Sequence, residues 1–264
     1  MHDNQFEPLS DVLPGVNCLG DLLHARGYDL TYMGGASTKF AGKAKFYQGH
    51  GFDTALGRDE LEDKAPAGYL NDWGLYDDTL LGLAEKRIRH LHDSDKPYAF
   101  FGLTLAGHPP FGNPSQSCID NQGPFDGTDI LYSIKCTGWL VRNFIERLRS
   151  EGLLDNTLVV VASDHLSMKN SAWEDLIAKE RENTLMMLGN GLRPRVIERP
   201  ASMVDVLPTL LEAMNYTIPD HRAGLGVSLF SSIPTLVERY SLEEMNQRMR
   251  SENLLQERLW NGVN

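Results

Sequence analysis

The sequence predicts an α/β fold in which a mainly parallel sheet is sandwiched by helices. Strand-like and helix-like segments alternate along the chain, which is typical of parallel strands joined by helical connections. The length of 264 residues and the 41% of hydrophobic residues fit one large domain or two small ones with a sizeable core. No internal repeat or low-complexity tract interrupts this alternation.

The first half of the chain shows two helices and two strands. Residues 19–26 predict a helix that Gly27 ends, and residues 28–33 predict a short strand that runs into two glycines. Apolar residues recur at helical spacing over residues 77–92, which indicates an amphipathic helix. The apolar run over residues 98–105 predicts a buried strand.

The second half continues the same pattern. Residues 130–149 form the clearest helix, because their apolar positions keep helical spacing and a glycine stop follows. Two further strands are expected over residues 157–162 and 183–188. Residues 202–214 predict a helix that accommodates Pro208 at a kink or at its start.

These elements imply three parts. Residues 1–17 look irregular, residues 18–240 form the folded domain, and residues 241–264 form a charged, amphipathic C-terminal helix. We find no strand before the first helix, so we expect the sheet to lack an N-terminal strand–helix unit.

Composition excludes several partners. The formal net charge of −11 argues against nucleic acid or an anionic membrane surface as the main partner. The longest apolar runs fall well short of the ~20 residues that span a bilayer. The first residues show no apolar signal core, so we expect this chain to be soluble.

Three cysteines leave at least one thiol unpaired within the chain. Cys118 and Cys136 flank a Gly/Pro/Asp-rich loop over residues 120–129, so a disulfide between them is reasonable in an oxidising compartment. Three reduced cysteines in a cytosolic protein remain the alternative, and Cys18 is the third.

Two candidate site motifs follow predicted strands. Asp164 and His165 come directly after the β-branched strand, where ligands of α/β proteins bind, and offer a carboxylate and an imidazole to a divalent metal. The alternative is a helix-capping aspartate beside a buried histidine. His108 follows the strand over residues 98–105 and precedes two prolines. It could contact the anionic centre of a substrate or be a surface loop histidine, and the two interpretations are about even.

Residues 38–47 carry three lysines interleaved with aromatics, among them Lys39 and Lys43. In an acidic protein this segment is an anion-attracting patch, although a solvated helix face is the alternative. Near residue 77, Asp77 or an earlier acid is expected to cap the helix that follows. Trp73 could form a wall of a substrate pocket.

Together these motifs resemble the sulfatase-like branch of the alkaline phosphatase superfamily. Within it, the phosphoglycerol transferases of periplasmic glucan modification are the most similar, and the lipoteichoic acid synthases are more distant. The matching stretches are residues 17–23 (NCLGDLL), 40–43 (FAGK), 50–53 (HGFD), 71–74 (NDWG), 163–166 (SDHL) and 172–173 (AW).

The resemblance implies a reaction. A threonine nucleophile attacks the phosphorus of a phosphatidylglycerol head group, and the glycerophosphoryl group then passes to a glucan hydroxyl, with Mn²⁺ or Mg²⁺ lowering the pKa of the nucleophile. Asp164 and His165 would be metal ligands, and His108 would lie near the phosphoryl group. Lys43 would bind glycerophosphate, and we group Lys39 and Trp73 with it as substrate-binding residues.

The resemblance also implies a location and a partial site. The family works at the periplasmic face of the inner membrane. The positions of cysteines in its members favour a Cys118–Cys136 disulfide, and they imply that the cysteine that would pair with Cys18 belongs to the missing nucleophile segment. The family's metal-binding acid and its threonine lie upstream of the stretch that matches residues 17–23. We therefore expect a truncated sulfatase-like domain with half a metal site, weak Mn²⁺ binding, no turnover, and membrane contact only through the missing part.

A basic residue of the lipoteichoic acid synthases corresponds to Lys43, but their neighbouring tryptophan is replaced by Ala41, so the pocket must differ. A sulfatase or phosphodiesterase of the same superfamily remains an alternative. A non-catalytic domain that binds a glycan or a lipid head group is the alternative from another class.

Overall fold

The computed structural model describes residues 9, 11–189 and 191–261. The chain divides into two compact units. The first comprises Met1–Val12, Asn17–Asp155 and Val161–Met186, and the second comprises Leu13–Val16, Asn156–Val160 and Met187–Asn264. We describe each unit separately.

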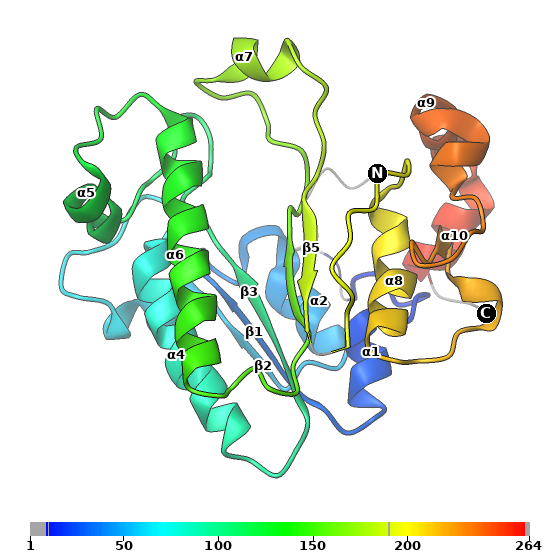
Figure 1. The fold of residues 1–264 in the computed structure, drawn as a ribbon, viewed down its shortest axis with the longest axis horizontal. Helices are drawn as coiled ribbons and strands as arrows, with labels where there is room; N and C mark the ends of the chain where they lie inside the picture. The colour runs from blue at the N-terminus through cyan, green and yellow to red at the C-terminus, as the bar shows by residue number, and fades with distance from the viewer. Residues whose placement is uncertain (1–8, 10, 190, 262–264) are drawn as a thin grey trace. The chain divides into compact units, whose positions relative to one another are not determined.

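A parallel three-stranded sheet forms the centre of the first unit (Figure 1). Strand β1 (Asp29–Gly34) lies between β2 (Thr54–Leu56) and β3 (Tyr98–Leu103), and both neighbours run parallel to it. Five of the six residues of β1 are buried. Such burial on both faces is typical of a parallel strand covered by helices on each side.

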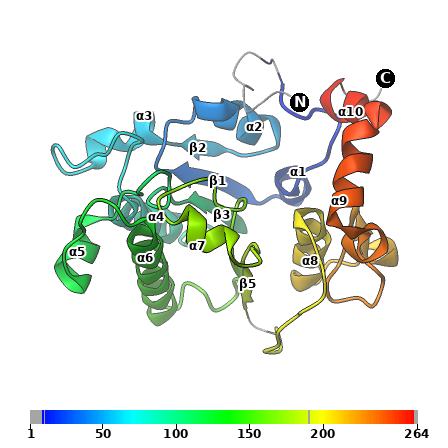
Figure 2. The same ribbon diagram turned by 90° about the horizontal axis from the view of Figure 1, so that it is seen from above.

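Helices cover both faces of this sheet, with α2 on one side and α4 and α6 on the other (Figure 2). Tyr32 of β1 stacks on Tyr47 of α2, with ring centroids 3.9 Å apart. The preceding side chain along the strand, Thr31, points the other way and accepts hydrogen bonds from Arg87 of α4 at 2.9 and 3.1 Å. This alternation confirms the predicted α/β fold with helices on both faces.

The helices of the first unit have clear bounds. They are α1 (Leu19–His24), α2 (Lys43–Gly49), α3 (Arg58–Leu61), α4 (Asp77–His92), α5 (Gln116–Gln122), α6 (Ile130–Ser150) and α7 (Trp173–Ile177), with short 3₁₀ helices η1 (Phe40–Gly42) and η2 (Glu62–Lys64). Glycine is required at residue 20 of α1, because a Cβ there would lie 2.2 Å from the carbonyl oxygen of His50.

A disulfide between Cys118 and Cys136 joins α5 to α6. Each cysteine lies inside a helix, so the loop that separates them is shorter than the sequence suggests. Both sulfur-bearing side chains are fully buried and pack in one apolar cluster with Leu81 and Leu140. The disulfide is therefore part of the core between these helices.

A second sheet consists of β4 (Val159–Ala162) and β5 (Leu185–Leu188). Exposure alternates along both strands, with Val160, Met186 and Leu188 among the exposed large hydrophobic residues. Within the described part of the chain, these two strands lack the double-sided cover that β1 has.

The second unit is built around a buried carboxylate. Asp205 accepts hydrogen bonds from the backbone N–H groups of Ser202 and Val227, both at 2.9 Å. Gly226 is required there, because a Cβ would lie 1.8 Å from the carbonyl oxygen of Val204. The elements of this unit are η3 (Met203–Asp205), α8 (Val206–Ala213), η4 (Pro219–His221), β6 (Arg222–Ala223), β7 (Gly226–Val227), α9 (Leu236–Ser251) and α10 (Asn253–Asn261).

Most predicted elements are present, and two of them differ from the prediction. Strand β3 is half-buried and not buried as predicted, because it is an edge strand of the sheet β2–β1–β3 among the described strands. The C-terminal segment begins at Leu236, bends at Ser241 where φ is +63°, and continues as a second helix. Strand β2 and helix α5 were not predicted from the sequence, because both are short.

The described residues 11–16 contain neither helix nor strand, as expected, whereas residues 1–8 and 10 lie outside the described residues. Among the helices that the structure describes, none is long and apolar enough to cross a membrane.

Candidate functional site

A buried carboxylate at the start of α4 positions the loop after β3. Asp77 is fully buried, and its Oδ1 accepts a hydrogen bond from the N–H of Leu105 at 2.6 Å. Its Oδ2 accepts from the N–H of Ala106 at 3.2 Å and from Oγ1 of Thr137 at 2.9 Å. Burial raises the pKa of Asp77, and these hydrogen bonds oppose that rise.

The expectation that Asp77 is the N-cap was wrong. Tyr76 is the N-cap, and Asp77 is the first helical residue. Its carboxylate lies close to the N-terminal end of the helix, but it accepts from loop amides and a threonine instead of from the helix's own N–H groups. Capping preference is a local rule, and here long-range partners compete for the carboxylate.

His108 lies on the loop that Asp77 holds. Its ring packs against the indole of Trp73, with centroids 3.6 Å apart and planes tilted by 35°. Its Nδ1 lies 3.0 Å from the carbonyl oxygen of Pro109, so the proton is assigned to Nδ1. This tautomer leaves the lone pair of Nε2 available to a substrate.

Trp73 is fixed by its own turn. The Oδ1 atom of Asn71 accepts from the N–H groups of Trp73 and Gly74 at 2.9 and 3.1 Å, which is an Asx turn. The indole also meets the ring of Phe40 edge-on, with centroids 5.9 Å apart. Trp73 therefore connects His108 to the η1 segment.

Lys43 completes this group. Its ammonium lies 4.4 Å from the centroid of the Phe40 ring and donates a hydrogen bond to the Phe40 carbonyl oxygen at 3.2 Å. Partial burial lowers the pKa of Lys43. We call Lys43, Phe40, Trp73 and His108 the Lys43–His108 cluster. The structure thus brings together three residues that the sequence singled out separately.

The neighbouring lysines lie elsewhere. Lys39 has a side chain that is 75% exposed, and its ammonium pairs with Asp59 at 3.2 Å. Lys45 donates to the carbonyl oxygen of Leu9 at 2.8 Å. Of the three lysines in this segment, Lys43 is the one that belongs to the Lys43–His108 cluster.

Asp164 and His165 follow β4 as predicted, and both side chains are more than half exposed, at 62% and 57%. The alternative of a buried histidine is therefore wrong. Nδ1 of His165 lies 2.8 Å from the carbonyl oxygen of Leu166, which leaves Nε2 facing Oδ2 of Asp164 at 3.5 Å. A backbone partner on Nδ1, with Nε2 turned toward a second ligand, is what a metal-binding histidine needs.

The carboxylate of Asp164 and the imidazole of His165 are suitable ligands for a divalent ion, but two ligands are too few to complete a metal site. Among the described residues, no third histidine, cysteine, aspartate or glutamate brings a ligand atom close to both of them. The structure does not bring the pair into contact with the Lys43–His108 cluster.

A different cluster does meet the spacing of a metal site. Ligand atoms of Cys18, Asp21 and His50 all lie within 4.8 Å of one another. Sequence analysis missed this group, although the stretches NCLGDLL and HGFD that hold it were both noted. Only the recurrence of those stretches in one family could have indicated it.

Hydrogen bonding argues that this second cluster is structural. Oδ2 of Asp21 accepts from the N–H of Cys18 at 2.7 Å and lies 2.8 Å from Nδ1 of His50. Nε2 of His50 lies 2.9 Å from the carbonyl oxygen of Val12, so both ring nitrogens already face oxygen acceptors of this chain. Burial and Asp21 raise the pKa of the Cys18 thiol to about 11, which disfavours the thiolate that a metal requires.

Comparison with known proteins gives a consistent picture. Residues 2–216 match the family described as Sulfatase. The phosphoglycerol transferase I of Xanthomonas axonopodis pv. citri is 34% identical over 235 residues, which is 87% of this chain and 33% of that protein. That of Citrobacter koseri is 34% identical over 232 residues, covering 86% of this chain and 30% of that protein. The chain therefore spans about a third of the length of these curated relatives.

Solved structures share the fold. A Vibrio parahaemolyticus protein of the alkaline phosphatase superfamily has a TM-score of 0.69 at 22% identity, over 88% of this chain and 55% of that one. A Streptococcus pyogenes phosphoglycerol transferase in complex with sn-glycerol-1-phosphate has a TM-score of 0.55 at 17% identity, over 90% of this chain and 62% of that one.

Proposed function

This chain belongs to the sulfatase family, and from that membership we propose that it binds and positions the glycerophosphate group in a phosphoglycerol transferase. The proposed donor is phosphatidylglycerol, and the proposed acceptor is a glucan hydroxyl in the periplasm. The buried Cys118–Cys136 disulfide supports an oxidising compartment.

The observation that carries this proposal is the Lys43–His108 cluster. A half-buried ammonium attracts a phosphate ester more strongly than an exposed one, because less water screens it. The free Nε2 of His108 can accept a proton from a substrate hydroxyl, and once it carries that proton it can donate a hydrogen bond to a phosphoryl oxygen. Trp73 keeps the imidazole in place by stacking, and Asp77 holds the loop behind it.

Asp164 and His165 would hold a divalent ion, Mn²⁺ or Mg²⁺, as two of its ligands. When bound, such an ion balances charge on phosphoryl oxygens and lowers the pKa of an attacking hydroxyl. We assign the nucleophile to no residue of this chain.

Binding of sn-glycerol 1-phosphate, measured by calorimetry, tests this function. We expect Lys43→Ala to weaken binding about tenfold, because it removes a charge-assisted contact. Lys39→Ala is the matched control, since that ammonium pairs with Asp59, and it should change the affinity less than about twofold.

Two outcomes would refute the proposal. One is no binding of sn-glycerol 1-phosphate by the unmodified chain. The other is an equal loss in both lysine variants, which would mean that only overall charge matters. Tight binding of a sugar sulfate in place of the phosphate ester would favour a sulfatase instead.

A further inference from the structure

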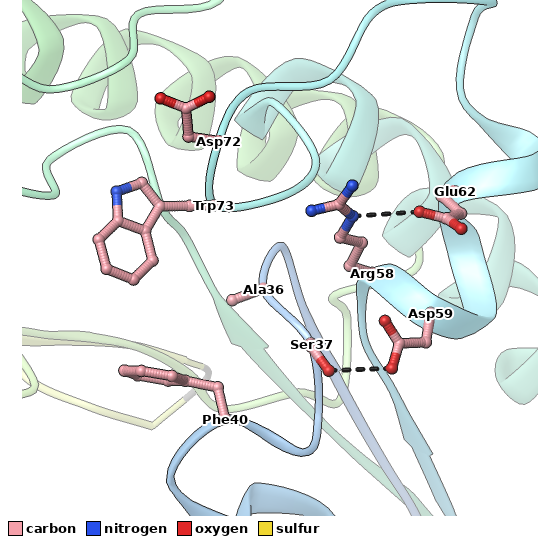
Figure 3. A pocket seen from close by; sticks show the side chains of 8 residues that line it. All are labelled: Ala36, Ser37, Phe40, Arg58, Asp59, Glu62, Asp72 and Trp73. Atoms are coloured by element: carbon pink, nitrogen blue, oxygen red, sulfur yellow. Dashed lines mark hydrogen bonds and ion pairs between the residues drawn. The ribbon is translucent and has the colours of Figure 1, made fainter.

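An open pocket lies beside Trp73 and Phe40, which form part of its lining (Figure 3). Its volume is about 380 Å³, which is room for one or two sugar rings but small for a lipid. Its lining comes from the loop after β1, from η1, α3 and η2, and from the loop that carries Trp73. The pocket thus shares Phe40 and Trp73 with the Lys43–His108 cluster.

Two aromatic rings form its apolar surface. Phe40 is 53% exposed, and its ring meets Trp73 edge-on, with the two ring planes at 77°. Partly exposed aromatic faces of this kind suit ligands that are apolar on one face and polar at the rim. Sugar rings have that character, because their C–H groups form flat apolar faces and their hydroxyls project outward.

The polar lining is acidic overall. Three carboxylates, on Asp59, Glu62 and Asp72, face one guanidinium, on Arg58. Arg58 is already paired with Glu62 at 3.1 Å, and Asp59 is already paired with Lys39 at 3.2 Å. Among the described residues that line the pocket, no basic side chain is without an acidic partner, so a phosphate or sulfate ester is disfavoured here.

A metal ion does not explain the carboxylates either. The described residues contain no group of three or more of His, Cys, Asp and Glu at this pocket with ligand atoms close enough for one ion. Asp72 is exposed and makes no hydrogen bond or ion pair with the described residues. A carboxylate in this state accepts hydrogen bonds from hydroxyl groups.

We propose that this pocket binds the acceptor of the transfer reaction, a neutral saccharide whose rings contact Phe40 and Trp73 and whose hydroxyls donate to Asp72 and Glu62. This inference rests on the proposed function, because it assigns the second substrate of the same reaction. The donor phosphate and the acceptor hydroxyl would then meet at Trp73, with the anionic group on the Lys43 side and the neutral one on the acidic side.

The test is binding of a linear β-linked glucose tetrasaccharide to the 264-residue chain, followed by saturation-transfer NMR and by calorimetry. Asp72→Ala should weaken saccharide binding about five- to tenfold while binding of sn-glycerol 1-phosphate changes less than about twofold. Asp175→Ala is the matched control, because that exposed carboxylate lies on α7 away from the pocket, and it should leave both affinities unchanged.

The outcomes separate the two proposals. Glycerophosphate binding without saccharide binding would overturn the acceptor pocket and leave the proposed function standing. Saccharide binding that Asp72→Ala and Glu62→Ala leave intact would place the acceptor elsewhere and overturn the assignment. Binding of neither ligand would overturn both proposals.

Discussion

Two regions of the first unit hold candidate site residues in different ways. Between β1 and His108, side chains are fixed by partners far away in sequence, as Asp77 is by Leu105 and Thr137. After β4, Asp164 and His165 contact each other and the carbonyl of Leu166, and both remain more than half exposed. Long-range contacts produce a preorganised site, whereas local ones produce a pair that needs further ligands or partners to become rigid.

The largest expected difference between the regions is in stability. Asp77→Ala leaves one buried N–H group, one partly buried N–H group and a partly buried hydroxyl without their acceptor, which should lower the free energy of unfolding by about 3 kcal/mol. Asp164→Ala removes an exposed carboxylate and should change it by less than about 0.5 kcal/mol. Urea unfolding of both variants measures the contrast, and equal effects would remove the distinction between the regions.

Cys18, the N-cap of α1, gives a chemical measure of burial in the first unit outside these two regions. Burial, and then the charge of Asp21, raise the pKa of this thiol from 9.0 to about 11. At pH 8 its thiolate fraction should be about 100-fold below that of an exposed thiol, so alkylation by iodoacetamide should be slow and should accelerate up to about pH 11.

Mass spectrometry of the alkylated chain follows this rate at Cys18 alone, because Cys118 and Cys136 are disulfide-bonded. Asp21→Asn removes the smaller of the two causes and should accelerate alkylation modestly. Alkylation of the unmodified chain at pH 8 as fast as that of free cysteine would show that Cys18 is not held as the structure has it.

Lys43 should make ligand binding depend on pH in a particular direction. Burial lowers its pKa, so the ammonium loses its proton at a lower pH than a free lysine does. Affinity for sn-glycerol 1-phosphate should therefore fall, by up to about tenfold, before an ordinary lysine would titrate. Lys43→Arg should retain affinity over the same pH range, since a guanidinium stays charged. The same falling profile in Lys43→Arg would assign the titration to another group.

The smallest expected effect is the binding of a divalent metal ion by Asp164 and His165, the second region. Two ligands rarely hold a labile divalent ion, so Mn²⁺ should bind this chain more weakly than micromolar in calorimetry. Asp164→Ala should remove what binding there is. A micromolar or tighter site that this substitution abolishes would show that Asp164 and His165 have further ligands and that the two regions are equally organised.

Local sequence pattern determined the elements that are long and strongly periodic. The helix over residues 77–92 has the predicted bounds, and the helix over residues 130–149 extends by one residue, because helical spacing of apolar side chains is visible over several turns. The strand before Asp164 was also predicted, because a β-branched run is a local signal. Lys43 and His108 could be singled out by residue type and by the loops around them.

Tertiary structure alone decided which of these residues meet. Trp73 stacks on His108 across 35 positions of sequence, and Asp77 is drawn from capping its own helix to binding a distant loop. The same packing pairs the ammonium of Lys39 with Asp59 and places the ammonium of Lys43 against Phe40 in the cluster, although the two lysines are only four residues apart. Residue type and spacing specify what a side chain can do, but the partners that select among those possibilities are brought near only when the strands and helices pack.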